Sequence, residues 1–276
     1  MTRRTAFRLA VTLLVMVFSG AFLAAQQIWV GGSGWGRFAP RFATIEDFDG
    51  RFIYCRGFFG SAYGRGGWTT DYPGADNNFS VRLAELTRVS VKFDPNRQPH
   101  HVVVRLDDPT LYRCPALFIE NVEMLRFTET EVLGLRNYLL KGGFLWVDDF
   151  WGSAAWSNWA REISRVLPPG EYPIFDIPLS HPIMHTMYDV KDFLQVSAIS
   201  FWYRSGGQVS ERGRDSAEVH YRGIQDSHGR LMMLATHNTD IADTWEREGE
   251  SREYFNLFSP RGYAIGVNVV LYALTH

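Results

Sequence analysis

The apolar positions of the chain follow two alternating patterns: short continuous runs, and a spacing of about three to four residues. Continuous runs are typical of buried strands, and the wider spacing is typical of one face of a helix. The predicted strands cover residues 52–58, 102–106, 116–119, 144–147, 219–224 and 231–236. The predicted helices cover Phe79 to Leu86 with Asn77 or Asn78 as cap, residues 154–166, and a last helix with Tyr263, Val267, Val270, Leu271 and Leu274 on one face. This alternation indicates an α/β domain.

The clearest unit of the pattern is a helix followed by a strand. Thr128 and Glu131 have the spacing of a capping box, which predicts a helix start. Gly142 and Gly143 end that helix, and the apolar run from Phe144 to Val147 follows as a strand. A strand, a helix and a second strand in this order predict a parallel crossover unit.

The first residues have the pattern of a secretory signal. Arg3, Arg4 and Arg8 precede an apolar run over 9–24 that is short for a membrane span. We expect cleavage after Ala25, with a retained N-terminal anchor as the alternative. Residues 26–50 then form an irregular leader, and residues 51–276 form a single domain.

Charge and cysteine content limit the function classes. The net charge of −2, which becomes more negative when the three arginines of the signal are removed, argues against a general nucleic-acid binder. No stable membrane span is expected after cleavage of the signal. The expected location is therefore the periplasm or the exterior. Cys55 and Cys114 either pair in that oxidising compartment or stay as two buried thiols, and both readings remain open.

Polar residues that follow the predicted strands are the first candidates for chemistry, because ligands of parallel sheets bind beyond the carboxyl ends of the strands. Asp148 and Asp149 follow Val147, and adjacent carboxylates can hold a metal or act as acid and base. The alternative is that one aspartate caps the next helix and the other faces water. His237 and Asp240 complete the candidate catalytic residues.

Histidines and carboxylates at short spacing predict a possible divalent-metal cofactor. His181 and His185 would lie one turn apart, although either can instead cap the turn or form an interior hydrogen bond. His237, Asp240 and Asp243 form a second candidate ligand group. Its alternative is a helix capped by Thr239 with acids in the first turn.

A third polar segment, residues 68–78, follows the first strand and should reach the same end of the sheet as the Asp148 loop. Asp71, Asp76 and Asn78 are its candidate ligand-binding residues, and the alternative is a turn that caps the helix. Trp151 is added as a possible sugar platform, although indole rings at this spacing more often pack a helix onto a sheet. The chain has neither a Gly-Lys-Ser/Thr phosphate loop nor a Gly-x-Ser-x-Gly motif.

Several of these motifs together resemble the bacterial family called domain of unknown function 4159. The resemblance rests on residues 68–78, 139–152, 180–185, 230–246 and 266–276, in that order. It implies a fold similar to class I glutamine amidotransferases, a flavodoxin-like three-layer α/β sandwich with a mostly parallel sheet. In that superfamily the cysteine nucleophile follows the strand equivalent to 144–147, where this chain has Asp148 and Asp149. An acidic residue expected before Trp156 is Ala155 here.

The resemblance implies no activity, so the expected function depends on the fold and the candidate residues. We expect a binding or assembly module of the cell envelope that lacks the cysteine nucleophile and acts on an unidentified envelope ligand or protein. One alternative is a metal-dependent hydrolase of envelope polysaccharide or peptide. A second alternative is a carbohydrate-binding protein.

Overall fold

A computed structural model of the chain describes residues 40–60 and 67–276. The expected signal, residues 1–25, lies outside the described residues, as do 26–39 of the expected leader. Residues 61–66 of the loop after the first strand lie outside them too.

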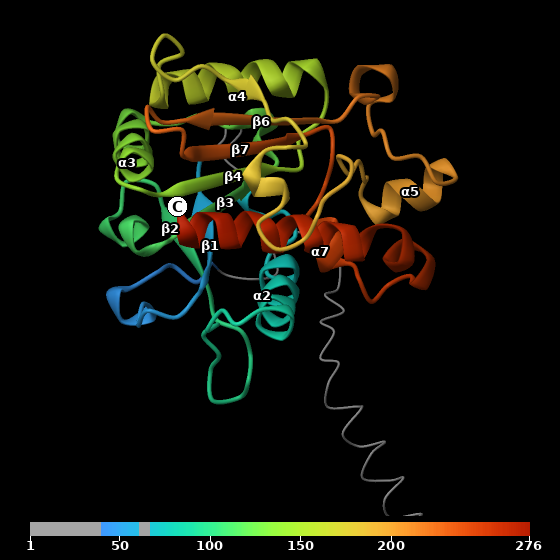
Figure 1. Cartoon of the computed structure of the whole chain (residues 1–276), viewed down its shortest axis with the longest axis horizontal. Coiled ribbons are helices and arrows are strands. Elements are labelled where there is room, and N and C mark those ends of the chain that lie inside the picture. Colours follow the sequence, from blue (N-terminus) through green and yellow to red (C-terminus); the bar gives the residue numbers. More distant parts are fainter. Residues whose placement is uncertain (1–39, 61–66) are drawn as a thin grey trace, which may run out of the picture.

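A single seven-stranded sheet forms the centre of the molecule (Figure 1), with the strand order β2-β1-β3-β4-β7-β6-β5. The strands are β1 (Tyr54–Phe58), β2 (His101–Arg105), β3 (Ala116–Glu120), β4 (Phe144–Asp148), β5 (Phe175–Asp176), β6 (His220–Gln225) and β7 (Leu231–His237). Pairing is parallel from β2 through β7, and β6 runs antiparallel to both of its neighbours. The sheet is therefore mostly parallel, as predicted.

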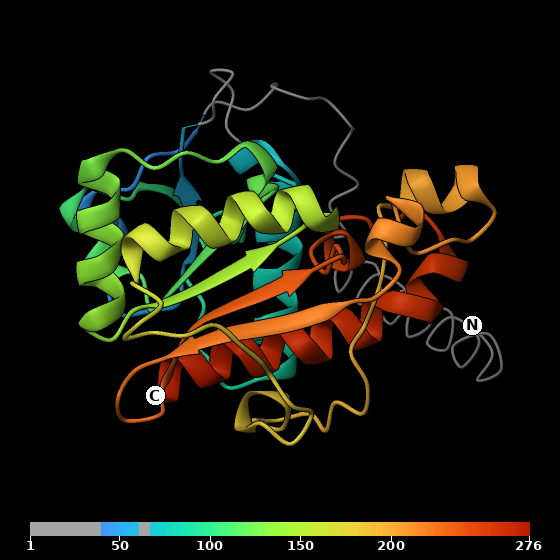
Figure 2. The same cartoon turned by 90° about the horizontal axis from the view of Figure 1, so that it is seen from above.

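Helices cover both faces of the sheet (Figure 2). The α-helices are α2 (Gly74–Leu86), α3 (Glu129–Leu140), α4 (Gly152–Val166), α5 (Ile199–Ser205), α6 (Asp243–Glu246) and α7 (Arg252–Thr275). Short 3-10 turns are η1 (Ile45–Asp47), η2 (Gly67–Thr69), η3 (Pro109–Arg113), η4 (Val122–Met124), η5 (Pro182–Met184) and η6 (Gly213–Ser216). Helices α3 and α4 lie on one face, and α2 and α7 lie on the other.

Alternation along the buried strands divides the core between the two faces. Phe118 and Trp146 point toward α2 and α7, whereas their neighbours Leu117 and Leu145 point toward α3 and α4. This is the two-residue period of a strand whose two faces are both covered. No helix in the described part of the chain is long and apolar enough to cross a membrane.

The predicted helix–strand unit is present at residues 129–148. Thr128 and Glu131 make the reciprocal capping box, and Gly142 follows the helix with a φ of 107°. The expected start of the Phe79 helix is wrong, because α2 begins at Gly74 and includes Asn77 and Asn78.

The predicted face of the last helix is correct for Tyr263, Val267 and Val270, which are buried. It is wrong for Leu274, which keeps 39% of its surface exposed. Position 274 lies in the last turn of α7.

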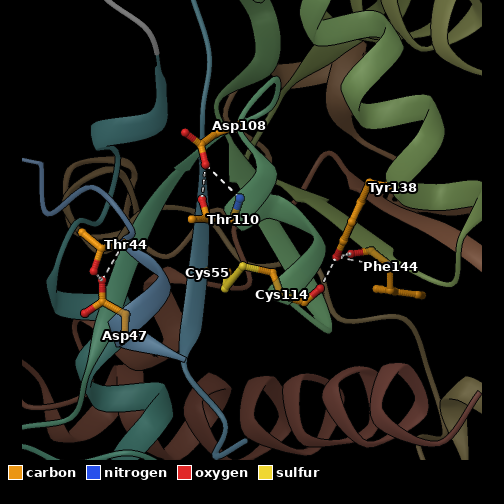
Figure 3. Close-up of a disulfide and its surroundings, with 8 residues drawn as sticks. All are labelled: Thr44, Asp47, Cys55, Asp108, Thr110, Cys114, Tyr138 and Phe144. Carbon is orange, nitrogen blue, oxygen red and sulfur yellow. Dashed lines mark hydrogen bonds between the residues drawn. A yellow bond between two sulfur atoms is a disulfide. The ribbon is translucent and has the colours of Figure 1, made fainter. Parts of the chain in front are cut away.

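A disulfide joins Cys55 on β1 to Cys114, just before β3 (Figure 3). The two Cα atoms lie 6.0 Å apart, within the normal range for a bridge. Tyr138 of α3 donates its hydroxyl to the carbonyl of Cys114 at 2.9 Å. Of the two readings left open by the sequence, pairing is the one present.

The described part of the expected leader lies along the outer edge of the sheet. The amide of Ala43 donates to the carbonyl of Val103 on β2, and the amide of Val103 donates to the carbonyl of Arg41. These bonds cover backbone groups that an edge strand would otherwise present to other chains.

Candidate functional site

The carboxyl ends of β1, β3, β4 and β7 lie together at one end of the sheet, as parallel pairing requires. Asp148, the last residue of β4, turns its carboxylate into the protein. Its Oδ1 accepts a hydrogen bond from Thr236 Oγ1 at 2.5 Å, and its Oδ2 accepts one from the amide of Ala242 at 2.9 Å. Burial raises the pKa of Asp148 to about 7. Asp148 therefore ties β4 to the loop after β7.

Asp149 occupies the sharp turn between β4 and α4. Its backbone is left-handed, with a φ of 50°, and its Oδ1 accepts the indole N–H of Trp151 at 2.9 Å. Burial raises its pKa well above the usual range of a carboxyl group. Neither aspartate caps α4, so that alternative is wrong. The first two amides of α4 donate instead to the side chains of Asn238 and Asp215.

The loop between β7 and α6 supplies two more buried aspartates. Asp240 and Asp243 are each 3% exposed. The amide of Asp243 donates to Asp240 Oδ1 at 2.9 Å. The amide of Ile199, at the start of α5, donates to Asp243 Oδ2 at 2.6 Å. One oxygen of each carboxylate is thus held in place by a backbone amide.

Asp71 reaches these two aspartates from the loop before α2. It has a left-handed backbone with a φ of 57°. One carboxylate oxygen from each of Asp71, Asp240 and Asp243 can be chosen so that all three lie within 4.8 Å of one another. The first residue of α2 also lies close to α6, because a Cβ at Gly74 would lie only 2.8 Å from Cγ of Glu246.

These carboxylates lie close to further acidic side chains. Burial raises the pKa of Asp71 well above its usual range, and the charges of Glu246 and Glu120 raise it further. Burial acts in the same way on Asp240, with added repulsion from Asp149 and Asp71. Buried like charges favour protonation unless a cation compensates them.

Little positive charge within the described residues balances the cluster. No arginine, lysine or histidine among them forms an ion pair with Asp71, Asp148, Asp149 or Asp240. Arg247 lies 3.5 Å from Asp243 and also pairs with Glu246. The site therefore has more buried carboxylates than cationic partners.

A separate ion network lies beside the cluster and was missed by the sequence reasoning. Arg56 of β1 is fully buried and pairs with Asp76 of α2 and with Glu120 of β3. It also donates to the carbonyl of Thr70 at 2.8 Å, immediately before Asp71. Asp76 is therefore a partner of Arg56. The available signal was a charged residue within one apolar strand, Arg56, and another at the end of a second, Glu120.

Aromatic rings pack beneath these groups on the α2 and α7 face. Tyr54 stacks on Phe118 with ring centres 4.3 Å apart, and Trp146 and Trp245 continue the row. The same four rings line a narrow space together with Glu120 and Asp148. Apolar packing of this kind keeps water away and lowers the local dielectric response, which strengthens every charge interaction above it.

His237 lies at the end of β7 but outside the group of three aspartates. Its Nε2 donates to the carbonyl of Gly152 at 3.0 Å, so in the neutral ring Nδ1 accepts from Arg222 at 3.3 Å. The rings of Phe150 and Trp156 pack beside it. Burial lowers its pKa to about 4, so the ring is neutral at physiological pH.

The other candidate residues have protein partners of their own. His181 Nδ1 accepts the amide of Ile183, as expected of a turn cap, and His185 bonds to Leu179 and Asp189. The two rings therefore do not share a ligand position. Asn78 donates to the carbonyl of Trp245 at 2.7 Å. Trp151 is 5% exposed, so it presents no open ring face for a sugar.

Comparison with known proteins gives a family but no activity. The sequence model of a family described as a domain of unknown function (DUF4159) matches residues 61–274. This range includes Asp71, Asp148, Asp149, Asp240 and Asp243. No curated protein matches the chain.

Proposed function

The chain belongs to the DUF4159 family, and we propose that it is an exported binding module of the cell envelope rather than an amidotransferase. We take its fold to be the flavodoxin-like three-layer sandwich of class I glutamine amidotransferases. The ligand site in this proposal is the carboxyl end of the sheet, lined by the aspartates of three loops. This is where ligands of open parallel sheets bind.

The observation that carries the proposal is the residue at the turn after β4. In the amidotransferase fold this turn presents a cysteine nucleophile, and here it presents Asp149 with a left-handed backbone. Both cysteines of the chain are used in the disulfide, so neither provides a thiolate. A thiol-dependent acyl transfer therefore has no nucleophile.

Electrostatics supports a ligand that carries positive charge. Asp240 is buried, and Asp71 and Asp149 are half-buried; none of the three carboxyl groups has an ion-pair partner among the described residues. An anionic ligand would add to this repulsion, whereas a cationic group would relieve it.

The disulfide supports export. Stable disulfides are typical of oxidising compartments, and the bond agrees with the signal expected at residues 1–25. A location in the periplasm or outside the cell is therefore part of the proposal.

The proposal is tested by thermal unfolding of the purified protein with cationic probes, namely MgCl₂, CaCl₂, MnCl₂, spermidine and a lysine tripeptide. At least one probe should raise Tm, because a ligand that binds only the folded state stabilises it. The increase should be lost in Asp240→Asn and kept in Asp192→Asn, whose side chain is 68% exposed and pairs with Arg261. No increase with any probe would refute a cation-binding face.

A metal-dependent hydrolase is the second candidate, favoured by the position of Asp149. A carboxyl group on a sharp strand-to-helix turn stands where related folds present a reacting group, and Asp148 lies directly beside it. This function requires release of soluble products from peptidoglycan or casein when Mn²⁺ is added. Turnover that is lost in Asp149→Asn would replace the binding module by the hydrolase, and its absence under these conditions keeps the binding module.

A further inference from the structure

We infer that Asp71, Asp240 and Asp243 form a binding site for one divalent cation of the oxygen-preferring class, Ca²⁺, Mg²⁺ or Mn²⁺. The inference rests on the proposed function, because it names the ligand of the same face of the sheet. It selects a metal ion over an organic ammonium group.

The donor set determines the class of ion. All three side chains offer carboxylate oxygens, and no histidine or cysteine joins the group among the described residues. Hard divalent cations take such oxygens at about 2.0–2.6 Å, whereas zinc and copper sites typically use nitrogen and sulfur. Oxygens on opposite sides of such an ion lie about 4–5 Å apart. The three oxygens, within 4.8 Å of one another, fit around one ion with little movement.

An unsatisfied oxygen at Asp71 is the independent sign of a ligand. Oδ2 of Asp71 is buried and has no hydrogen-bond partner within residues 40–60 and 67–276, although other atoms of the residue are partly exposed. A buried acceptor without a partner destabilises the folded state, and more so when it is charged. A water molecule would satisfy the hydrogen bond but leave the negative charge, whereas a cation satisfies both.

The surroundings hold the three carboxylates in place without using all their oxygens. A backbone amide fixes Asp240 Oδ1, and another fixes Asp243 Oδ2. Behind Asp71, its own carbonyl accepts the amide of Ala75, and the carbonyl of Thr70 accepts from Arg56. Such supporting bonds orient ligands in known metal sites.

The rival arrangement is a cluster of protonated carboxyl groups that share hydrogen bonds and hold no ion. It places the same residues together but predicts no affinity for metals. The two are separated by calorimetric titration of EDTA-treated, dialysed protein with CaCl₂, MgCl₂ and MnCl₂.

The expected result is about one ion per chain for at least one of these salts. Affinity should fall at least about tenfold in Asp71→Asn and in Asp240→Asn, because each loses a charged ligand. Asp192→Asn is the control and should bind as the wild type does. Wild-type protein that binds none of the three ions at millimolar concentration overturns the inference, and so do variants that bind as tightly as the wild type.

A measurement on the unaltered protein covers the case in which the variants do not fold. Tb³⁺ replaces Ca²⁺ in oxygen sites and emits when a nearby indole is excited, and Trp245 lies two residues after Asp243. Emission that appears with Tb³⁺ and decreases on adding CaCl₂ supports the site, and its absence counts against it. Stabilisation by spermidine without any metal binding would refute this inference alone. Absence of binding by every probe would refute the proposed function as well.

Discussion

The disulfide between Cys55 and Cys114 gives a stability prediction whose size follows from the chain length that it closes. The bond joins β1 to the segment before β3 across a sequence separation of 59 residues. Closing a loop of this length restricts the unfolded chain and destabilises it by about 4 kcal/mol at 25 °C. Replacing both cysteines, in Cys55→Ala/Cys114→Ala, should therefore lower the free energy of unfolding by about 3–5 kcal/mol.

The folded state is expected to survive this change, because other contacts hold the two positions. Cys55 lies in β1 between β2 and β3, and Cys114 is held by the hydroxyl of Tyr138. Both residues are buried, so small cavities add to the loss. The loss should therefore appear in the free energy of unfolding, whereas the far-UV circular dichroism of the folded protein should not change.

The assay is equilibrium unfolding in urea, followed by circular dichroism and tryptophan fluorescence. Cys55→Ala alone should lose nearly as much as the double variant, because either one removes the bond. A double variant within about 1 kcal/mol of the wild type would refute the loop argument. Two reactive thiols in the unfolded, unreduced wild-type protein would refute the bond itself.

Two further predictions concern His237 and Gly262. Because burial lowers the pKa of His237 to about 4, the unfolded chain takes up a proton near pH 6.5 that the folded protein does not. The contribution of His237 to the free energy of unfolding is thus full above pH 6.5 and decreases by up to about 3 kcal/mol as the pH falls to 4. Urea unfolding at several pH values should show a smaller decrease in stability for His237→Gln than for the wild type. An equal decrease would contradict the assignment of this pH dependence to His237. A Cβ at Gly262 in α7 would lie 2.7 Å from Cβ of Thr244, so Gly262→Ala should destabilise the protein by roughly 1–3 kcal/mol. Gly170→Ala, where the added atom meets no atom of the described residues within 4 Å, should stay near wild type in thermal unfolding.

The sequence predicted the elements that local chemistry defines. The capping box at Thr128, the glycine that ends α3 and the apolar run of β4 each depend on residues close in the chain. The start of α2 at Gly74 could not be predicted in this way. It depends on contacts with α6, more than 160 residues away, where Asn78 donates to the carbonyl of Trp245.

The candidate site was likewise predictable only in part. The rule that parallel strands end on one side indicated which loops to consider, and Asp71, Asp240 and Asp243 all belong to those loops. The sequence could not show that Asp76 pairs with Arg56, or that His237 turns toward Gly152. The direction of a side chain at a strand end depends on its neighbours in space, which spacing along the chain does not give.

What the sequence by itself determined, therefore, is the α/β class, the order along the chain of the strands other than β5 and of the helices α2, α3, α4 and α7, and the end of the sheet where polar loops gather. The tertiary structure decided which carboxylates meet, which are neutralised by arginine and whether the two cysteines are within bonding distance. The physical reason is the distance along the chain over which each interaction acts. Capping, periodicity and turn chemistry act over a few residues, whereas burial and charge pairing act between segments that only the strand order β2-β1-β3-β4-β7 brings together.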